Sequence, residues 1–281
     1  LKSEKVKTNK TLKISQTTES LIIKGIDFQI NFSKKNGNIT SYIVNGFELI
    51  KNQMQPTFWR APTDNDFGNN MQKRALIWKN VMNNAMIKSF TKKYISTTEV
   101  AISTLIDLPD VNGEIKLDYL IYGNGQVDVS YDFSASKKDL PEIPRIGMVI
   151  QLTETLENLK YYGRGPMENY IDRNTASFVG IYESKVKEQY FAYGRPQENG
   201  HKTDVRWINL YNQSGMGLSV NAIHTPLEFN ALPLLQSELD PGLEKKLRTI
   251  VDVKNGNVTE LHIDHKMMGV GGDNSWKAKP H

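Results

Sequence analysis

The chain has 281 residues, of which 38% are hydrophobic and 23% charged, a composition that excludes a disordered chain and suits one large β domain or two smaller ones. Its 35 Lys and Arg exceed its 31 Asp and Glu by only four and are dispersed along the chain, so nucleic-acid binding is not indicated. The sequence has no run of roughly 18 apolar residues, so a membrane-spanning helix is not indicated either. The absence of cysteine excludes disulfides, thiolate nucleophiles and thiolate metal sites.

Residues 1–17 are rich in Lys, Thr and Ser and show little periodicity. We expect a linker or the tail of a preceding domain there, with a first edge strand around Thr11–Ser15. The opening LKSEKVKTNK has no initial Met and no apolar signal core, which predicts an excised piece of a longer protein. The folded domain is expected over residues 18–281.

A meander of antiparallel strands is predicted from residue 26 onward. Apolar residues alternate with polar ones over Ile26–Ser33, as in a strand with one buried face. Asn36-Gly37 and Asn45-Gly46 are hairpin signals, because both central residues of a type I′ turn need positive φ. Strands are predicted between and after these turns, over Ile39–Val44 and Phe47–Ile50.

Strand patterns dominate the rest of the chain, and one short helix interrupts them. Apolar residues at helical spacing predict this helix over residues 70–82, with Asn69 or Asn70 available as N-cap. Many short strands without a βαβ rhythm or a fixed-period repeat predict an all-β fold, a large antiparallel β-sandwich. The further predicted strands cover residues 94–106, 114–122, 127–133, 145–152, 157–162, 204–211, 217–222, 246–253 and 258–265.

Four polar and aromatic stretches stand apart from the strand pattern. The first, FWRAPTDNDFG at residues 58–68, has no secondary-structure period, and its aromatic residues favour burial. We expect a buried junction in which Arg60 is paired with a carboxylate. The other stretches are YYGRGPMENYIDR (161–173), YGRPQENGHKTDVRW (193–207) and GVGGDNSW (269–276), and such loops at the ends of a sandwich are where binding residues concentrate.

A mainly structural role, in ion pairs and hydrogen bonds that tie these stretches to the sheets, is predicted for most of their polar and aromatic residues. The residues so assigned are Phe58, Trp59, Arg60, Asp64, Asn65, Asp66, Glu168, Asp172, Arg173, Glu198, Asn199 and Arg206.

Catalytic chemistry within the chain has one candidate on residue type alone. Glu168 and Glu198 have the chemistry of a glycosidase carboxylate pair, which a retaining enzyme needs about 5 Å apart, and the sequence leaves that distance open. Neither a G-x-S-x-G elbow nor a phosphate-binding loop with Gly-Lys-Ser/Thr occurs, which disfavours serine nucleophile and nucleotide chemistry.

No metal site is predicted. The run Asp64–Gly68 is similar to the start of a calcium loop, but the bidentate Glu required at the twelfth position is missing. His262 and His265 are three residues apart in a predicted strand, which places them on opposite faces.

In their order along the chain, FWRAPTDNDFG, GRGPMENYIDR, RPQENG followed by DVRW, and GVGGDNSW resemble the landmarks of the C-terminal, small-chain domain of bacterial β-galactosidases of glycoside hydrolase family 2. The resemblance covers about residues 18–276. It implies a galactose mutarotase-like sandwich, which agrees with the strand pattern. It also implies a parent enzyme in which an N-terminal jelly roll, immunoglobulin-like domains and a TIM barrel precede this domain, and the barrel carries the catalytic glutamates.

By this resemblance, the parent enzyme hydrolyses terminal β-D-galactosyl bonds with retention, uses a divalent cation with sodium as a further candidate, and is a homo-oligomer in the bacterial cytoplasm or periplasm. The present chain is expected to hold no catalytic residue, metal or cofactor and to be inactive alone. Its implied partners are the catalytic TIM barrel and other domains of the parent chain, and the β-galactoside substrate.

Trp276 is the one substrate-binding residue that the resemblance implies. The matching Trp of the family stacks on the leaving-group sugar, and an indole offers a broad apolar face to the C–H side of a pyranose. The family continues past this motif into a further strand, whereas this chain stops at His281. The sandwich is therefore expected to be truncated before its last strand.

Two other functions stay open on the sequence. The same fold suits a stand-alone carbohydrate-binding module, or an aldose mutarotase-like enzyme that uses His and Glu around a sugar. His201, His224, His262 and His265 do not lie in mutarotase motifs.

Overall fold

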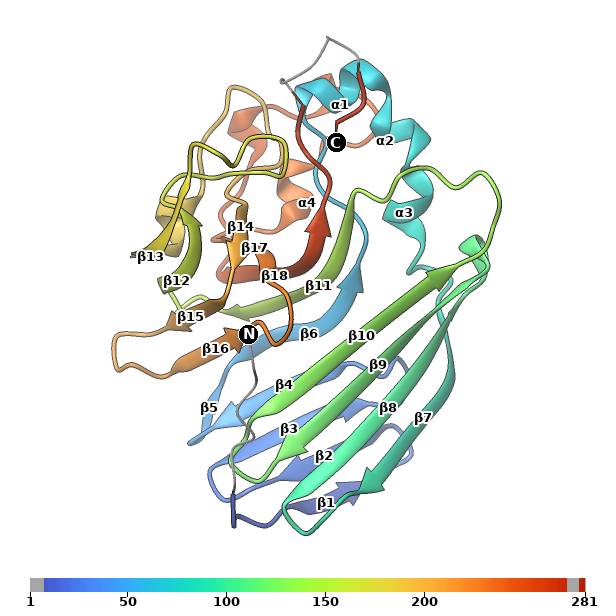
Figure 1. The fold of residues 1–281 in the computed structure, drawn as a ribbon, viewed down its shortest axis with the longest axis vertical. Coiled ribbons are helices and arrows are strands. Elements are labelled where there is room, and N and C mark those ends of the chain that lie inside the picture. The colour runs from blue at the N-terminus through green and yellow to red at the C-terminus, as the bar shows by residue number, and fades with distance from the viewer. Residues whose placement is uncertain (1–7, 272–277, 281) are drawn as a thin grey trace. The chain divides into compact units, whose positions relative to one another are not determined.

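The structure is a computed structural model that describes residues 8–271 and 278–280 (Figure 1). The expected domain falls into two compact units. Unit A consists of the described residues up to Gln55 together with Asn80–Leu140, and unit B consists of Pro56–Lys79 together with the described residues from Pro141 onward. Antiparallel sheets build both units, which confirms the all-β prediction. Among the described residues, no helix is long and apolar enough to cross a membrane.

The first sheet of unit A is a meander in the order β1-β2-β3-β4-β5. Side chains of β3 alternate between buried and half-buried, as the period-two pattern predicts. Asn45 and Gly46 have φ of 50° and 79°, so the type I′ turn predicted there is confirmed. The edge strand expected near residue 13 is β1, which pairs with β2. The strands are β1 (Lys13–Gln16), β2 (Ser20–Lys24), β3 (Phe28–Ser33), β4 (Ile39–Val44) and β5 (Phe47–Glu48).

The second sheet of unit A has the order β10-β9-β8-β7. Phe32 of the first sheet meets Tyr119 of the second with ring centroids 5.1 Å apart, within the core between the sheets. The single strand predicted over residues 94–106 is wrong: Ile95 and Ser96 donate backbone hydrogen bonds to the Glu99 carbonyl and form a turn between two strands. The strands are β7 (Met86–Tyr94), β8 (Glu99–Leu108), β9 (Gly113–Tyr122) and β10 (Val127–Ala135), with the 3-10 turn η1 (Pro109–Val111) before β9.

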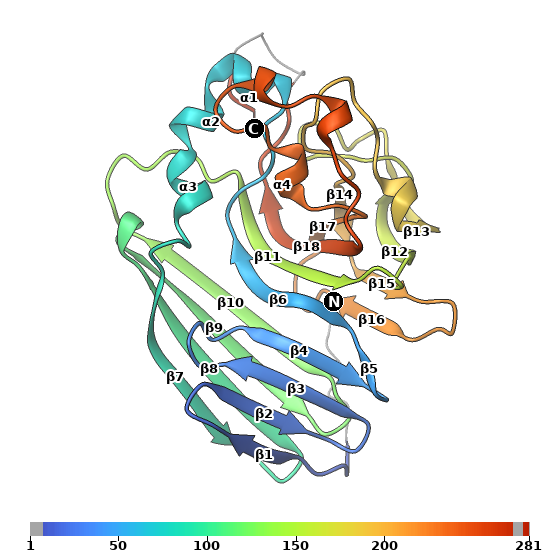
Figure 2. The same ribbon diagram turned by 180° about the vertical axis from the view of Figure 1, so that it is seen from behind.

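The first sheet of unit B has the order β14-β17-β18-β11-β6. Figure 2 shows β11 between β18 and β6. Two of its strands, β14 and β17, lie where the sequence pattern predicted none or a different boundary. Its strands are β6 (Ile50–Thr57), which passes from unit A into unit B, β11 (Arg145–Thr153), β14 (Lys202–Val205), β17 (Leu227–Leu232) and β18 (Val258–Met267).

The second sheet of unit B has the order β13-β12-β15-β16. Tyr161 of β12 meets Phe229 of β17 at 5.2 Å between ring centroids, so the two sheets of this unit also pack together. The strand predicted over residues 204–211 is wrong, because the chain leaves the first sheet at Arg206 and continues in the second. The strands are β12 (Asn158–Gly165), β13 (Phe178–Lys185), β15 (Trp207–Tyr211) and β16 (Gly217–Asn221).

The helix predicted over residues 70–82 is wrong in its extent. Asn70 adopts a left-handed conformation (φ 63°, ψ 29°) that ends one helix and precedes the next. The first helix begins at Asp64, inside the stretch that was expected to have no period, with Thr63 as its N-cap. A strand predicted over residues 246–253 is also wrong and is replaced by two 3-10 turns. These elements are α1 (Asp64–Asn69), α2 (Met71–Arg74), α3 (Leu76–Asn80), α4 (Gln236–Leu239), η2 (Val186–Gln189), η3 (Lys245–Leu247) and η4 (Ile250–Asp252).

Candidate functional site

The first polar-aromatic stretch is built around a buried ion pair. Arg60 and Asp66 both have side chains that are 0% exposed, and two nitrogen–oxygen contacts of 2.5 and 3.2 Å join them. Burial alone would lower the pKa of Arg60, but the charge of Asp66 and its hydrogen bonds raise it above its usual value. Arg60 therefore has the carboxylate partner that its position in the stretch requires.

The same carboxylate also fixes the start of α1. Thr63 donates its backbone N–H (2.7 Å) and its hydroxyl (3.0 Å) to Asp66, and the Thr63 hydroxyl accepts the backbone N–H of Asp66. This reciprocal arrangement is a capping box. One carboxylate thus serves both the helix cap and the guanidinium, which explains why the stretch needs Thr and Asp at this spacing.

The first stretch is tied directly to the fourth. Arg60 donates to the carbonyl of Gly269 (2.7 Å), and the side-chain amide of Asn65 donates to the carbonyl of Val270 (3.0 Å). The second stretch joins them, because the backbone N–H of Gly271 donates to Asp172 (2.7 Å). A Cβ at Gly269 would lie 2.2 Å from the Asp172 carboxylate, so only glycine fits there.

Glu168 ties the second stretch to the third. Its carboxylate pairs with Arg173 (2.5 Å) and accepts the backbone N–H of Gly200 (2.7 Å) and the hydroxyl of Tyr193. Arg173 also lies over the ring of Tyr170, 4.8 Å from the ring centroid. With the hydroxyl of Tyr170 at 3.5 Å, four donors from the second and third stretches surround the Glu168 carboxylate.

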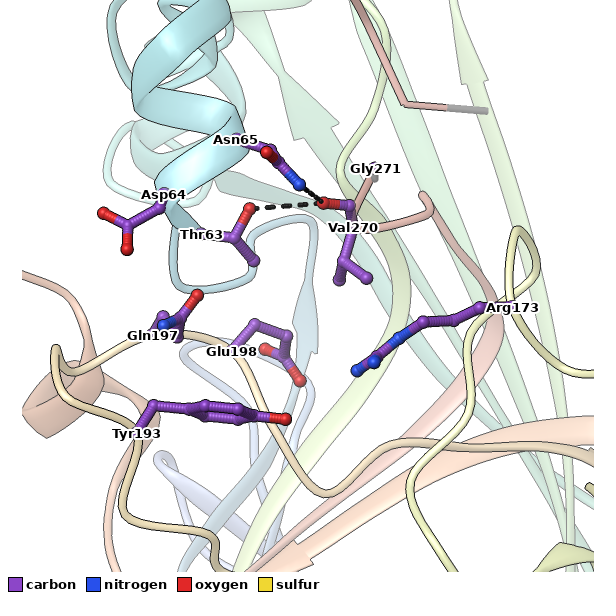
Figure 3. Close-up of a pocket in the computed structure, with 9 residues that line it drawn as sticks. All are labelled: Thr63, Asp64, Asn65, Arg173, Tyr193, Gln197, Glu198, Val270 and Gly271. Carbon is purple, nitrogen blue, oxygen red and sulfur yellow. Dashed lines mark hydrogen bonds between the residues drawn. The ribbon is translucent and has the colours of Figure 1, made fainter. Parts of the chain in front are cut away.

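These contacts bring all four stretches around one open pocket with a volume of about 180 Å³ (Figure 3). In the close-up, Glu198 and Tyr193 form one side, and Arg173 reaches toward Glu198 from another element. Every stretch contributes to the wall, although they are up to about 200 residues apart in sequence. The lining residues are Thr63, Asp64, Asn65, Arg173, Tyr193, Gln197, Glu198, Val270 and Gly271.

Glu198 connects the pocket to a buried polar network. One of its oxygens accepts the side-chain amide of Asn230 (2.6 Å) and lies 3.5 Å from Arg145. Arg145 is 1% exposed and donates to the side-chain oxygens of Asn230 (2.6 Å) and Gln236 (2.5 Å). The floor of the pocket is therefore held by buried groups of the sheet β14-β17-β18-β11-β6 and of α4.

The network includes two buried histidines. Nδ1 of His262 accepts from Arg145 (3.0 Å), so Nε2 carries the proton and donates to Glu260 (3.1 Å). His201 differs, because its two nitrogens face the side-chain oxygens of Asn230 (2.9 Å) and Glu228 (3.1 Å). Both are acceptors, and each of these contacts is a hydrogen bond when the ring nitrogen that makes it carries the proton.

Carboxylates in the network have shifted pKa values. Burial raises the pKa of Glu228 and of Glu260, but hydrogen bonds from His201 and His262 outweigh it, and both pKa values lie below their usual range. For Asp264 burial prevails over the charge of Arg145 and raises the pKa. The carboxylates that receive direct hydrogen bonds from histidine are thus the ones held ionised.

Lys202 on β14 is a buried amine beside this site. Its ammonium donates to the carbonyl of Gly200 (3.0 Å), and burial lowers its pKa to about 8, with Glu168 opposing that shift. Burial also raises the pKa of the Tyr170 phenol, whose ring stacks on His201, well above its usual value.

The other residues predicted as structural lie in packed positions outside the pocket wall. Phe58 stacks on Trp78 with ring centroids 5.8 Å apart, and the indole of Trp59 donates to Asp240 (2.8 Å). The Asn199 side chain is buried and bonded to the backbone of its own loop, and Arg206 lies over the ring of Tyr162. Trp276, predicted to bind substrate, lies outside the described residues.

The structure also brings in residues that the sequence reading missed, chiefly Arg145, His201, Glu228, Asn230 and Asp264. A signal for some of them was present: Glu260, His262 and Asp264 occupy every second position of β18. In the register of β17 with β18, Glu228 faces Asp264 and Asn230 faces His262. Polar residues on one face of two adjacent strands indicate a buried polar network. Within residues 8–271 and 278–280, no group of three or more His, Asp or Glu is arranged to hold a metal ion.

Comparison with known proteins places the chain in a family. A family model described as "Beta galactosidase small chain" matches residues 24–281. The chain belongs to this family. It is 34% identical over 279 residues to a beta-galactosidase of Priestia megaterium and 31% identical over 279 residues to one of Halalkalibacterium halodurans. Both alignments include 96% of this chain. It is 34% identical over 263 residues to a beta-galactosidase of Lactobacillus delbrueckii subsp. bulgaricus, in an alignment that includes 93% of this chain.

The chain spans about a quarter of the length of these relatives, 25%, 26% and 25% respectively. A crystal structure described as a "putative mutarotase" from Salmonella typhimurium aligns with 96% of this chain and 90% of its own, with a TM-score of 0.46 and 9% identity. A likeness of that size bears on neither activity nor ligand.

Proposed function

We propose that this β-galactosidase domain is part of an enzyme that hydrolyses terminal β-D-galactosyl residues with retention of configuration, and that it completes the mouth of the active site on the leaving-group side. The observation that carries this proposal is the family match over residues 24–281 to proteins named beta-galactosidase. The catalytic acid/base and nucleophile would lie in a TIM barrel outside this chain, and the isolated chain would be inactive.

The arrangement of the four stretches supports a role in binding. They come from different strands and loops of unit B, and ion pairs and hydrogen bonds hold them together around one pocket. Loops that a rigid scaffold holds in this way present side chains to a ligand with little loss of conformational entropy on binding. Glu168 is saturated by Arg173, Tyr193 and Gly200, so it is better suited to positioning the loops than to acting as a nucleophile.

The proposal extends to the partners and cofactors of the parent enzyme. The domain would contact the catalytic barrel and the remaining domains, and the assembled enzyme would be a homo-oligomer. A divalent cation, with sodium as a further candidate, would be bound by the parent outside this domain. In such an enzyme, this domain would contact the leaving group of the substrate.

The test is Trp276→Ala in the full-length enzyme, assayed on lactose and on a galactoside with a small synthetic leaving group. Loss of an aromatic platform is worth about 1–3 kcal/mol by analogy with base stacking, or roughly tenfold to a hundredfold in kcat/KM. We expect this loss on lactose and a much smaller one on the synthetic substrate, because stacking acts on the leaving group alone. Equal losses on both substrates would contradict the assignment.

A further inference from the structure

The pocket of unit B has a wall that is polar, of both charge signs and only partly bonded to itself. Glu198 is buried, and Oε1 is the oxygen that accepts Asn230. Among the described residues, no hydrogen bond or ion pair reaches its second oxygen, Oε2. The remaining oxygen of a carboxylate that lines an open pocket is a strong acceptor for a ligand hydroxyl, because charge-assisted hydrogen bonds are the strong ones.

Two side chains that can donate hydrogen bonds line the pocket together with this acceptor. Arg173 has a side chain that is 48% exposed, pairs with Glu168 through one terminal nitrogen, and directs its guanidinium toward Glu198 (Figure 3). Gln197 lies beside Glu198 on the same loop, and its amide bonds only weakly to the Arg195 carbonyl at 3.4 Å. The wall of one pocket therefore offers both an acceptor and donors to the hydroxyl groups of a small molecule.

The charges exclude other classes of ligand. Glu198 and Asp64 repel an anion, and the guanidinium of Arg173 repels a cation, so a neutral ligand that both donates and accepts hydrogen bonds fits best. Tyr193 and Val270 add an aromatic and an aliphatic surface for the C–H side of such a ligand. The volume, about 180 Å³, lies below the 300–1,000 Å³ range of drug-sized ligand sites and suits a single ring.

We infer that this pocket is a binding site for one neutral sugar ring, with Glu198 and Arg173 holding neighbouring hydroxyls and Gln197 as a further donor. The chemistry of the wall is independent of the activity proposed for the parent enzyme, because it rests on the geometry of unit B alone. A single ring in an open polar site would bind with a dissociation constant on the order of 1 mM.

The experiment is a titration of the 281-residue chain with D-galactose, D-glucose and lactose, and with sulfate as an anion probe. Binding is measured by calorimetry and by changes in NMR chemical shifts. We expect millimolar binding of at least one sugar and none of sulfate. Glu198→Gln, which keeps the shape but removes the charge, should weaken sugar binding roughly tenfold. Glu244→Gln is the matched control, since Glu244 is an exposed carboxylate paired with Lys73 at 3.4 Å, and should leave binding unchanged.

Because Glu198 also belongs to the buried network, Gln197→Ala is the second variant and should weaken binding two- to tenfold without changing the thermal midpoint. Sulfate that binds the wild type more tightly than any sugar would identify an anion site instead. The inference would be overturned if no sugar binds at a concentration roughly 50-fold above the expected dissociation constant. It would also be overturned if the Glu198→Gln and Gln197→Ala variants bind sugar as tightly as the wild type does. These results do not depend on Trp276 or on catalysis, so they are separable from failure of the proposed function.

Discussion

Removing Arg60 is the sharpest test of the buried junction. Arg60→Ala leaves Asp66 as a fully buried carboxylate that keeps two hydrogen bonds from Thr63 but loses both contacts with the guanidinium. The carbonyl of Gly269 loses its 2.7 Å donor at the same time. Breaking a buried ion pair by removing one partner costs about 3–5 kcal/mol, because the remaining charge is uncompensated.

For a unit of this size, each kcal/mol lowers the unfolding midpoint by roughly 2–4 °C, so Arg60→Ala should lower it by roughly 6–20 °C. Thermal unfolding followed by circular dichroism measures this shift, and urea titration gives the free energy of unfolding. The matched control is Lys73→Ala, which removes an exposed ion pair of 3.4 Å with Glu244 and should cost less than about 1 kcal/mol.

The double variant Arg60→Met, Asp66→Asn separates charge from packing. It removes both charges, so it should be less destabilised than Arg60→Ala. An Arg60→Ala protein with an unchanged unfolding midpoint would refute the claim that an uncompensated charge is the cause. So would a double variant that is less stable than Arg60→Ala, with a loss of stability equal to the sum of two independent losses at Arg60 and Asp66.

Three further outcomes follow from the fold and the shifted pKa values. The isolated chain should give a far-ultraviolet circular dichroism spectrum of β type, and a helix-dominated spectrum would contradict the fold. Lys202→Met removes a buried amine whose pKa is lowered from 10.5 to about 8. Between about pH 8 and 10.5 the unfolded chain binds more protons than the folded chain, so the free energy of unfolding of the wild type should rise by about 3 kcal/mol relative to this variant over that range. Free energies of unfolding that change in parallel with pH in the two proteins would argue against this prediction. Glu228 and Glu260 have lowered pKa values, so their stabilisation is complete above the unfolded value of about 4.3 and is lost as the pH falls through the folded values, and Glu228→Gln should flatten this acid limb in urea titrations.

Local patterns predicted the sheets of unit A well, because each strand there follows its neighbour through a tight turn. The strand Ile39–Val44 and the turn at Asn45-Gly46 were predicted where they lie, since alternation and positive-φ residues are both local signals. The hairpin between β7 and β8 was missed because its turn, Ser96-Thr97-Thr98, contains neither Gly nor Asn. The signal there was a backbone hydrogen bond, which the residue types do not reveal.

Predictions in unit B failed where tertiary contacts override local preference. Apolar spacing correctly placed Trp78 on a buried helical face, but the expected helix is interrupted at Ala75 (φ −95°, ψ 11°), which lies between α2 and α3. The strand read through Arg206 is two strands, because sheet membership depends on pairing and not on alternation. Residues 246–253 alternate less clearly and have few buried side chains, so nothing in the core holds them in a sheet.

The convergence of the four stretches could not be read from sequence, because it depends on which sheet each flanking strand joins. Arg60 and Asp172, about 110 residues apart, contact the same Gly269–Gly271 segment through hydrogen bonds that no spacing rule predicts. Residue type did indicate that each charge needed a partner. What the sequence left open was the identity of that partner and the pocket that the pairs enclose.

Glu198 shows that structural and binding roles are not alternatives. One oxygen is held by Asn230 and Arg145 in the buried network, and this leaves the second oxygen facing the pocket. A carboxylate fixed in this way loses little conformational freedom when a ligand hydroxyl binds, whereas a free surface Glu would lose much more. Substitutions in the network, such as Asn230→Ala, should therefore weaken sugar binding although Asn230 lies behind the pocket wall. If Asn230→Ala instead binds sugar like wild type while its thermal midpoint falls, the network supports the fold alone, and the orientation of Glu198 has another cause.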